Sequence, residues 1–119
     1  MRHAFAHEAV LVMQPDADLR APGAAITVAL CGHWDHQPPC PLAAHHTRAE
    51  RTGDRVRVRT LFAAEPEAEQ IVRQRIDQAL SAGHLEGPDA VVTHWRLDTS
   101  QPSEVTAEET DHAERLTRD

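Results

Sequence analysis

The chain has 119 residues and a formal net charge of −7, with nine histidines, two cysteines, twelve arginines and no lysine. This length predicts a single domain, and the acidic balance excludes the dense basic surface that nucleic-acid binding requires. The chain has no membrane-spanning apolar stretch, and its N-terminus lacks the apolar run of a signal peptide. We therefore expect a cytoplasmic protein with no nucleic-acid or membrane partner, in which a cysteine pair more often binds metal than forms a disulfide.

Two apolar patterns in the first quarter of the chain predict strands. Glu8–Gln14 contains a short apolar run that ends at the turn-forming residues Pro15–Asp18. In Ala24–Cys31, large apolar residues such as Ile26 and Leu30 alternate with small or polar ones, which is the period-two pattern of a half-buried strand.

The next segment is the most informative part of the chain, because residues 31–46 hold both cysteines and four of the nine histidines. Its prolines prevent regular ladder bonding, so we expect Gly32–Arg51 to be a loop. Thiolate sulfur and neutral imidazole are ligands that suit Zn²⁺. The predicted zinc shell consists of Cys31, His33 and Cys40, completed by His36, His45 or His46.

Other interpretations of this segment stay open, because its spacing is not that of a recognised zinc finger or ribbon. Cys31 could be a small buried apolar residue with solvated histidines after it. Cys31 and Cys40 could instead form a disulfide or a redox pair. Trp34 could cover a metal site or contact a partner.

The run Cys31-Gly-His33-Trp-Asp35-His36, after an apolar segment, resembles the His-x-His-x-Asp-His motif of the metallo-β-lactamase superfamily. In that family the motif binds two zinc ions, one of which activates water for hydrolysis. The match covers six residues of this chain, with Cys31 in place of the first histidine. The residues that follow, Gln-Pro-Pro-Cys-Pro, differ from the glycine-containing start of a helix in that family. The resemblance adds Asp35, beside His36, as an alternative metal ligand.

Asp54–Phe62 has the clearest strand pattern in the sequence. Its apolar face carries Val56, Val58, Thr60 and Phe62, and its other face carries Arg55, Arg57 and Arg59. We expect the arginine row to face solvent, where it could bind an anion, an acidic partner or the protein's own acidic tail.

A helix is predicted to follow, with Pro66 near its first position and acidic residues in its first turn. Glu69 and Arg73 are spaced as an i,i+4 ion pair, and Gly83 is a natural stop. The apolar stripe of this helix consists of Ala68, Ile71, Val72, Ile76, Ala79 and Leu80.

The pattern of Ala90–Leu97 predicts the last strand, with Trp95 on its core face and His94 on the opposite face. Residues 104–119 carry six acids and two arginines, a composition typical of a solvated or disordered tail. Within that tail, Thr106–Glu109 has the spacing of a capping box and could begin a short helix.

The order β-β-β-α-β predicts an α+β fold: a two-layer, mostly antiparallel four-stranded sheet covered by one amphipathic helix. Residues 1–103 would form the domain, with its Pro/His/Cys-rich loop at 31–46, and residues 104–119 the acidic tail. The leading hypothesis is a small zinc-binding protein that acts as an accessory, assembly or interaction subunit. It could join a homo-oligomer or a larger assembly through its exposed sheet face or its tail. The alternatives are a small zinc-dependent hydrolase or other metalloenzyme, with an open water position, and a metal-free interaction module.

Overall fold

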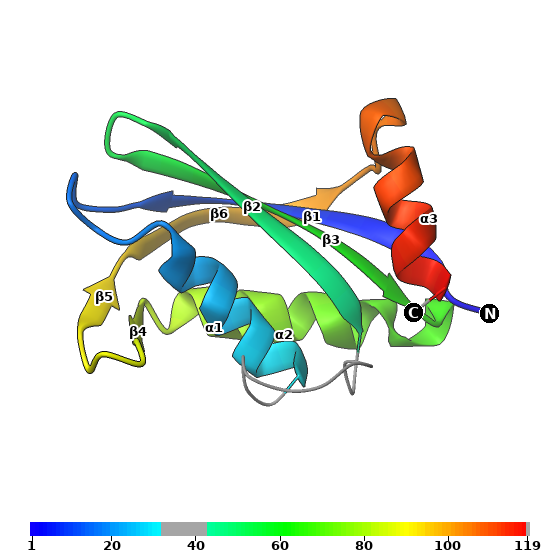
Figure 1. Cartoon of the computed structure of the whole chain (residues 1–119), viewed down its shortest axis with the longest axis horizontal. Helices are drawn as coiled ribbons and strands as arrows, with labels where there is room; N and C mark the ends of the chain where they lie inside the picture. The colour runs from blue at the N-terminus through cyan, green and yellow to red at the C-terminus, as the bar shows by residue number, and fades with distance from the viewer. Residues whose placement is uncertain (32–42, 119) are drawn as a thin grey trace.

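The computed structural model describes residues 1–31 and 43–118, and it has the predicted α+β class with a four-stranded antiparallel sheet (Figure 1). The elements are β1 (His3–Val12), α1 (Arg20–Cys31), β2 (Ala44–Thr52), β3 (Arg55–Ala64), η1 (Pro66–Ala68), α2 (Glu69–Ser81), β4 (His84–Glu86), β5 (Val92–His94), β6 (Arg96–Ser103), η2 (Ala107–Glu109) and α3 (Thr110–Arg118).

The strands of the sheet are ordered β2-β3-β1-β6, and every neighbouring pair is antiparallel. Together with α1 and α2, these strands make the β-α-β-β-α-β connection of the ferredoxin-like arrangement. The small hairpin of β4 and β5 is inserted between α2 and β6. No helix within the described ranges is long and apolar enough to cross a membrane.

The strand prediction for Ala24–Cys31 is wrong, because this segment forms most of helix α1. Residues four apart share a side in both a strand and a helix, so the buried pair Ile26 and Leu30 fits either structure. Val28 distinguishes the two interpretations. A strand would bury it beside Ile26 and Leu30, whereas in the helix Val28 is 37% exposed. The apolar pattern therefore has the period of a helix and not the period of two that we predicted.

The predicted loop Gly32–Arg51 is also wrong in its second part, because residues 44–52 form strand β2. This strand pairs with β3 from Ala44↔Ala63 to Thr52↔Arg55. The hairpin closes at Gly53, whose φ of +65° lies in the left-handed region that glycine adopts without strain. The prolines on which the loop prediction rests all precede residue 44, so they gave no reason to continue the loop to Arg51.

The last strand of the sheet begins later than predicted. Ala90–Leu97 is divided between β5, which belongs to the hairpin, and β6, which pairs with β1. β6 is polar and contains Pro102, which an edge strand tolerates. Trp95 is buried as predicted, and its indole Nε1 donates a hydrogen bond to the carbonyl of Leu80 at 2.8 Å.

Strand β3 and helix α2 confirm the two best local patterns. The predicted apolar face of β3 is buried, and so are Val72, Ile76 and Leu80 of the helix stripe, although Ile71 is half exposed. The helix ends where predicted, at Gly83 with a φ of +77°. A Cβ at this position would lie 2.9 Å from the carbonyl oxygen of Trp95, so the approach of the hairpin requires glycine.

In place of the single covering helix that we predicted, helices lie on both faces of the sheet (Figure 1). α1 and α2 pack over the face that carries Leu11, Val56 and Phe62. η2 and α3 continue the chain beyond β6, and Leu116 of α3 packs on the opposite face against Leu61. The acidic tail is therefore a helix packed on the sheet, and its start has the capping box predicted at Thr106–Glu109.

Candidate functional site

The predicted zinc ligands fall mainly in or beside the part of the chain that the structure does not describe. Cys31 is the last residue of α1, and His45 and His46 lie at the start of β2. The other predicted ligands, with Asp35 and Trp34, lie outside the described residues; they are His33, His36 and Cys40. Within the described ranges, no three His, Cys, Asp or Glu side chains gather into a group that could hold a metal.

His45 joins the start of β2 to the last turns of α1. Its Nδ1 lies 3.1 Å from the carbonyl oxygen of Ala43, so Nδ1 carries the ring proton and donates it. Its Nε2, 2.8 Å from the Thr27 hydroxyl, is then the acceptor. An Nδ1–H held by a backbone carbonyl is common among metal-binding histidines, but here Nε2 already accepts from Thr27, so a metal could bind it only in exchange for that hydrogen bond.

His46 points to the opposite face of the sheet, because successive residues of a strand alternate. Its ring centroid lies 4.5 Å from that of His112 on α3. Burial, followed by the proximity of His112 and Arg48, lowers the pKa of His46. A single ion held by the segment before β2 can therefore use His45 or His46, but not both.

A buried polar cluster that sequence reasoning missed lies where β1, α2 and β6 meet. His7 is only 2% exposed, and its Nδ1 lies 3.0 Å from Nη1 of Arg73, which also donates to the carbonyl of Ala6 at 2.7 Å. His7 Nε2 lies 2.8 Å from the hydroxyl of Ser100, which in turn donates to the carboxylate of Asp77. Burial is the main cause that lowers the pKa of His7, although Asp77, 3.4 Å from Nε2, acts in the opposite direction, and the net shift favours the neutral ring.

Serine, histidine and aspartate meet in this cluster, but their hydrogen bonds run in the wrong direction for nucleophilic catalysis. A catalytic histidine accepts the proton of the serine hydroxyl. Here Nδ1 of His7 must accept from Arg73, so Nε2 carries the proton and donates to Ser100. The hydroxyl proton of Ser100 is directed to Asp77, and the cluster joins α2 to β1 and β6.

Arg73 forms the predicted ion pair with Glu69, with 2.9 Å between Nε and Oε2, but the pair is not a surface contact. The guanidinium is buried and lies 5.3 Å from the ring centroid of Phe62 and 5.9 Å from that of Phe5. In the sequence, Arg73 directly follows Val72 of the apolar stripe of α2. This position was the available sign that the arginine is buried.

The arginine row does not simply face solvent. The side chain of Arg59 is 10% exposed, and Nε and Nη2 hold both carboxylate oxygens of Glu109 at 2.7 and 2.8 Å. These hydrogen bonds are the main cause that lowers the pKa of Glu109 to about 2. Glu109 belongs to the tail, so one arginine of the row does bind the acidic tail of its own chain.

The other two arginines of the row also face acids of this chain. Arg55 pairs with Asp98, and Nε of Arg57 lies 3.9 Å from a carboxylate oxygen of Glu8. The row is therefore largely compensated within the molecule.

No protein-family model matches this chain, and no curated protein is significantly similar to it. The ferredoxin-like arrangement hosts many unrelated functions, so the fold alone does not supply one. Information about function lies in the chemistry of particular side chains.

Proposed function

We propose that this protein is a small zinc-binding protein with a non-catalytic role, an accessory, assembly or interaction subunit of the cytoplasm. One Zn²⁺ ion would be held by Cys31, His33, Cys40 and either His36 or His45. The observation that carries the proposal is the concentration of thiol and imidazole ligands in the sixteen residues from the end of α1 to the start of β2.

The contacts at the two ends of the segment support this ligand set. Thr27 lies one helical turn before the end of α1, and its hydroxyl bonds His45 at the start of β2. The segment therefore leaves and re-enters the fold at positions that a hydrogen bond joins. Of the two strand histidines we favour His45, whose Nε2 would exchange the Thr27 hydrogen bond for zinc, because His46 faces α3 on the other side of the sheet.

Two further observations favour this role over the alternatives. The buried Ser100–His7 contact has the hydrogen-bond direction that opposes proton removal from serine, which disfavours a serine-type hydrolase and leaves the zinc-dependent hydrolase to the ligand count tested below. The arginine row and Glu109 of the tail, which a metal-free interaction module would use, already pair with charged groups of the same chain.

The test is elemental analysis of protein purified without a histidine tag. We expect about one zinc per chain, and its loss in Cys40→Ser, because a neutral hydroxyl is a far poorer ligand than a thiolate. His3→Gln, which removes an exposed histidine of β1, is the matched control and should keep the metal. Removing zinc with a chelator should lower the melting temperature by more than about 5 °C, because the ion stabilises only the folded state.

X-ray absorption at the zinc edge separates this role from the enzyme alternative. Four protein ligands with two sulfurs support a structural ion, whereas three protein ligands and one water would favour a zinc hydrolase. His45→Gln should weaken zinc binding and His46→Gln should not. Metal-free protein from cells supplied with zinc would contradict the proposal.

A further inference from the structure

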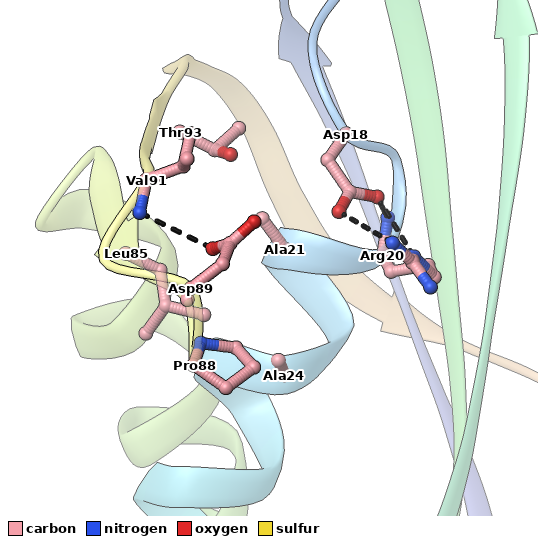
Figure 2. Close-up of a pocket in the computed structure, with 10 residues that line it drawn as sticks. Asp18, Arg20, Ala21, Ala24, Leu85, Pro88, Asp89, Val91 and Thr93 are labelled. Carbon is pink, nitrogen blue, oxygen red and sulfur yellow. Dashed lines mark hydrogen bonds and ion pairs between the residues drawn. The ribbon is translucent and has the colours of Figure 1, made fainter.

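A pocket of about 410 Å³ lies between the first turns of α1 and the β4–β5 hairpin (Figure 2). This volume is within the usual range for small-molecule sites. Its lining is mostly apolar: Ala21 and Ala24 come from α1, and Leu85, Pro88 and Val91 come from the hairpin. Val91 is 60% exposed, so a ligand in the pocket would remove apolar surface from water.

The charged groups at the rim are two acids and one arginine. Arg20 is held by both oxygens of Asp18, at 3.0 Å from Nε and 3.1 Å from Nη2, so these two charges compensate each other. Asp89 accepts a hydrogen bond from the backbone amide of Val91 at 3.2 Å, and Figure 2 shows its carboxylate between the hairpin and Ala21. Among residues 1–31 and 43–118, Asp89 forms no ion pair within 4.0 Å, although its charge helps Asp18 to raise the pKa of Arg20.

The turn that presents Asp89 is strained. Ala90 has a φ of 66°, in the left-handed region that residues with a Cβ rarely adopt. Backbone hydrogen bonds from Ala90 to Gly87 at 3.0 Å and from Gly87 to Val91 at 2.9 Å hold it there. A Cβ on Gly87 would lie 3.0 Å from Oδ1 of Asp89, so this glycine leaves room for the carboxylate. Strain of this kind is concentrated at ligand-binding sites.

The start of α1 is unsuited to an anion. The amide of Arg20 donates to the carboxylate of Asp18, the amide of Ala21 donates to the carbonyl of Asp18, and Pro22 has no amide hydrogen. The first two amides are used, the third residue has none, and a carboxylate already occupies the end of the helix. The pocket therefore combines an apolar lining with a net negative rim.

We propose that this pocket binds a small organic cation with an apolar body, an amine or amidine carried on a hydrocarbon skeleton. The cationic group would lie at Asp89 and the apolar body over Ala21, Ala24 and Val91. This inference does not depend on the zinc proposal, since none of these residues belongs to the predicted zinc shell.

The experiment is an NMR titration of ¹⁵N-labelled protein at low salt with benzylamine, benzyl alcohol and benzoate, which share a ring and differ in charge. We expect benzylamine to shift the amides of Ala21, Val91 and Thr93. It should bind about two- to fivefold more tightly than benzyl alcohol, the range that a partly exposed ion pair supplies, and benzoate should bind most weakly.

Asp89→Asn keeps an acceptor for the amide of Val91 and removes the charge, so benzylamine and benzyl alcohol should then bind equally. Glu86→Gln is the matched control, because it removes one acid from the same hairpin outside the pocket lining and should leave the ranking unchanged. Ala24→Leu should fill the pocket and abolish binding of all three probes.

Several results would overturn the proposal. One is the absence of shifts at the pocket amides in the unmodified protein, a measurement that requires no variant to fold. Another is equal binding of the three probes to the unmodified protein. A third is a Glu86→Gln effect as large as that of Asp89→Asn, which would assign the preference to overall charge.

Discussion

The two faces of the sheet are covered in different ways. The face under α1 and α2 is an apolar core that includes Leu11, Ile26, Val56, Phe62 and Ile76, all fully buried. The face under α3 is covered by a small cluster of Leu116 with Leu61 and three alanines. Packing contributes most of the stability on the first face, so α3 must depend more on polar contacts.

Each face has an arginine whose side chain is at least nine-tenths covered, and the two differ in what surrounds them. Arg73 is enclosed by the rings of Phe5 and Phe62 and by polar groups of α2 and β1. Arg59 lies at the edge of the α3 cluster, where it holds Glu109. The comparison indicates that Arg73 belongs to the global core, whereas Arg59 attaches one terminal helix to the sheet.

The largest expected effect on stability is that of Arg73→Ala, which removes a buried charged donor from the face under α1 and α2. It leaves Glu69, the carbonyl of Ala6 and Nδ1 of His7 without their buried donor, so the free energy of unfolding should fall by about 3–5 kcal/mol. Urea denaturation followed by circular dichroism measures it. Arg75→Ala, on the same helix but exposed, should cost less than about 0.5 kcal/mol. Equal losses in the two variants would contradict a buried role for Arg73.

Arg59→Gln should have a smaller and local effect on the second face. Hydrogen bonds to a charged partner contribute about 1.5–3 kcal/mol, so α3 should exchange its amide hydrogens faster while α2 does not. Arg57→Gln is the control, since its side chain is 61% exposed and Glu8 is 3.9 Å away. Added salt should weaken α3 protection in the unmodified protein. Uniform acceleration in α2 and α3 would show that the two faces unfold together.

Acid should loosen the α3 face in two pH windows. The folded pKa of His46 lies below its ordinary 6.5, so its stabilising contribution is lost as pH falls from 6.5 toward the folded pKa. The pKa of Glu109 falls from 4.5 to about 2, so its contribution is lost between these values as pH decreases. Amide exchange of α3 against pH measures both windows. His46→Gln should flatten the first and Glu109→Gln the second.

His7 makes the stability of the core face depend on pH only below 6.5, the range already given for His46. Its lowered pKa means that the unfolded state binds the proton more readily below 6.5, so acid reduces global stability there. Thermal unfolding at pH 7 and pH 5 tests this. Unchanged global stability in the unmodified protein would contradict the neutral, buried state of His7.

The smallest effects are expected at the turns, outside both faces. Gly53→Ala should cost about 1 kcal/mol, because an L-residue is strained at its positive φ although no atom obstructs the new Cβ. Ala90→Gly should be neutral or stabilising by up to about 1 kcal/mol, because relief of strain is offset by the greater freedom of unfolded glycine. Thermal unfolding detects both. A loss in Ala90→Gly would mean that Ala90 makes a packing contact that compensates its strain.

Local patterns were sufficient for β3, α2 and the start of the tail helix. Each depends on side chains a few residues apart: the alternation of Val56 and Val58, the stripe of Val72 and Ile76, and the capping box of Thr106. The composition of residues 31–46 likewise identified candidate zinc ligands without reference to the fold. These inferences need no knowledge of which segment lies beside which.

The errors arose where the deciding contact is distant in sequence. Ile26 and Leu30 suit a strand or a helix equally, and β6 is a strand because β1 offers it an edge rather than because its own residues favour one. His7 and Ser100 are 93 residues apart, and the candidate cation pocket joins α1 to a hairpin more than sixty residues later. The sequence by itself determined the α+β class and the period of its clearest elements, because neighbouring residues set these, and it supplied the zinc site as a hypothesis. Only the tertiary structure decided which arginine is buried, which face each histidine occupies and where a pocket forms, because those properties depend on long-range packing.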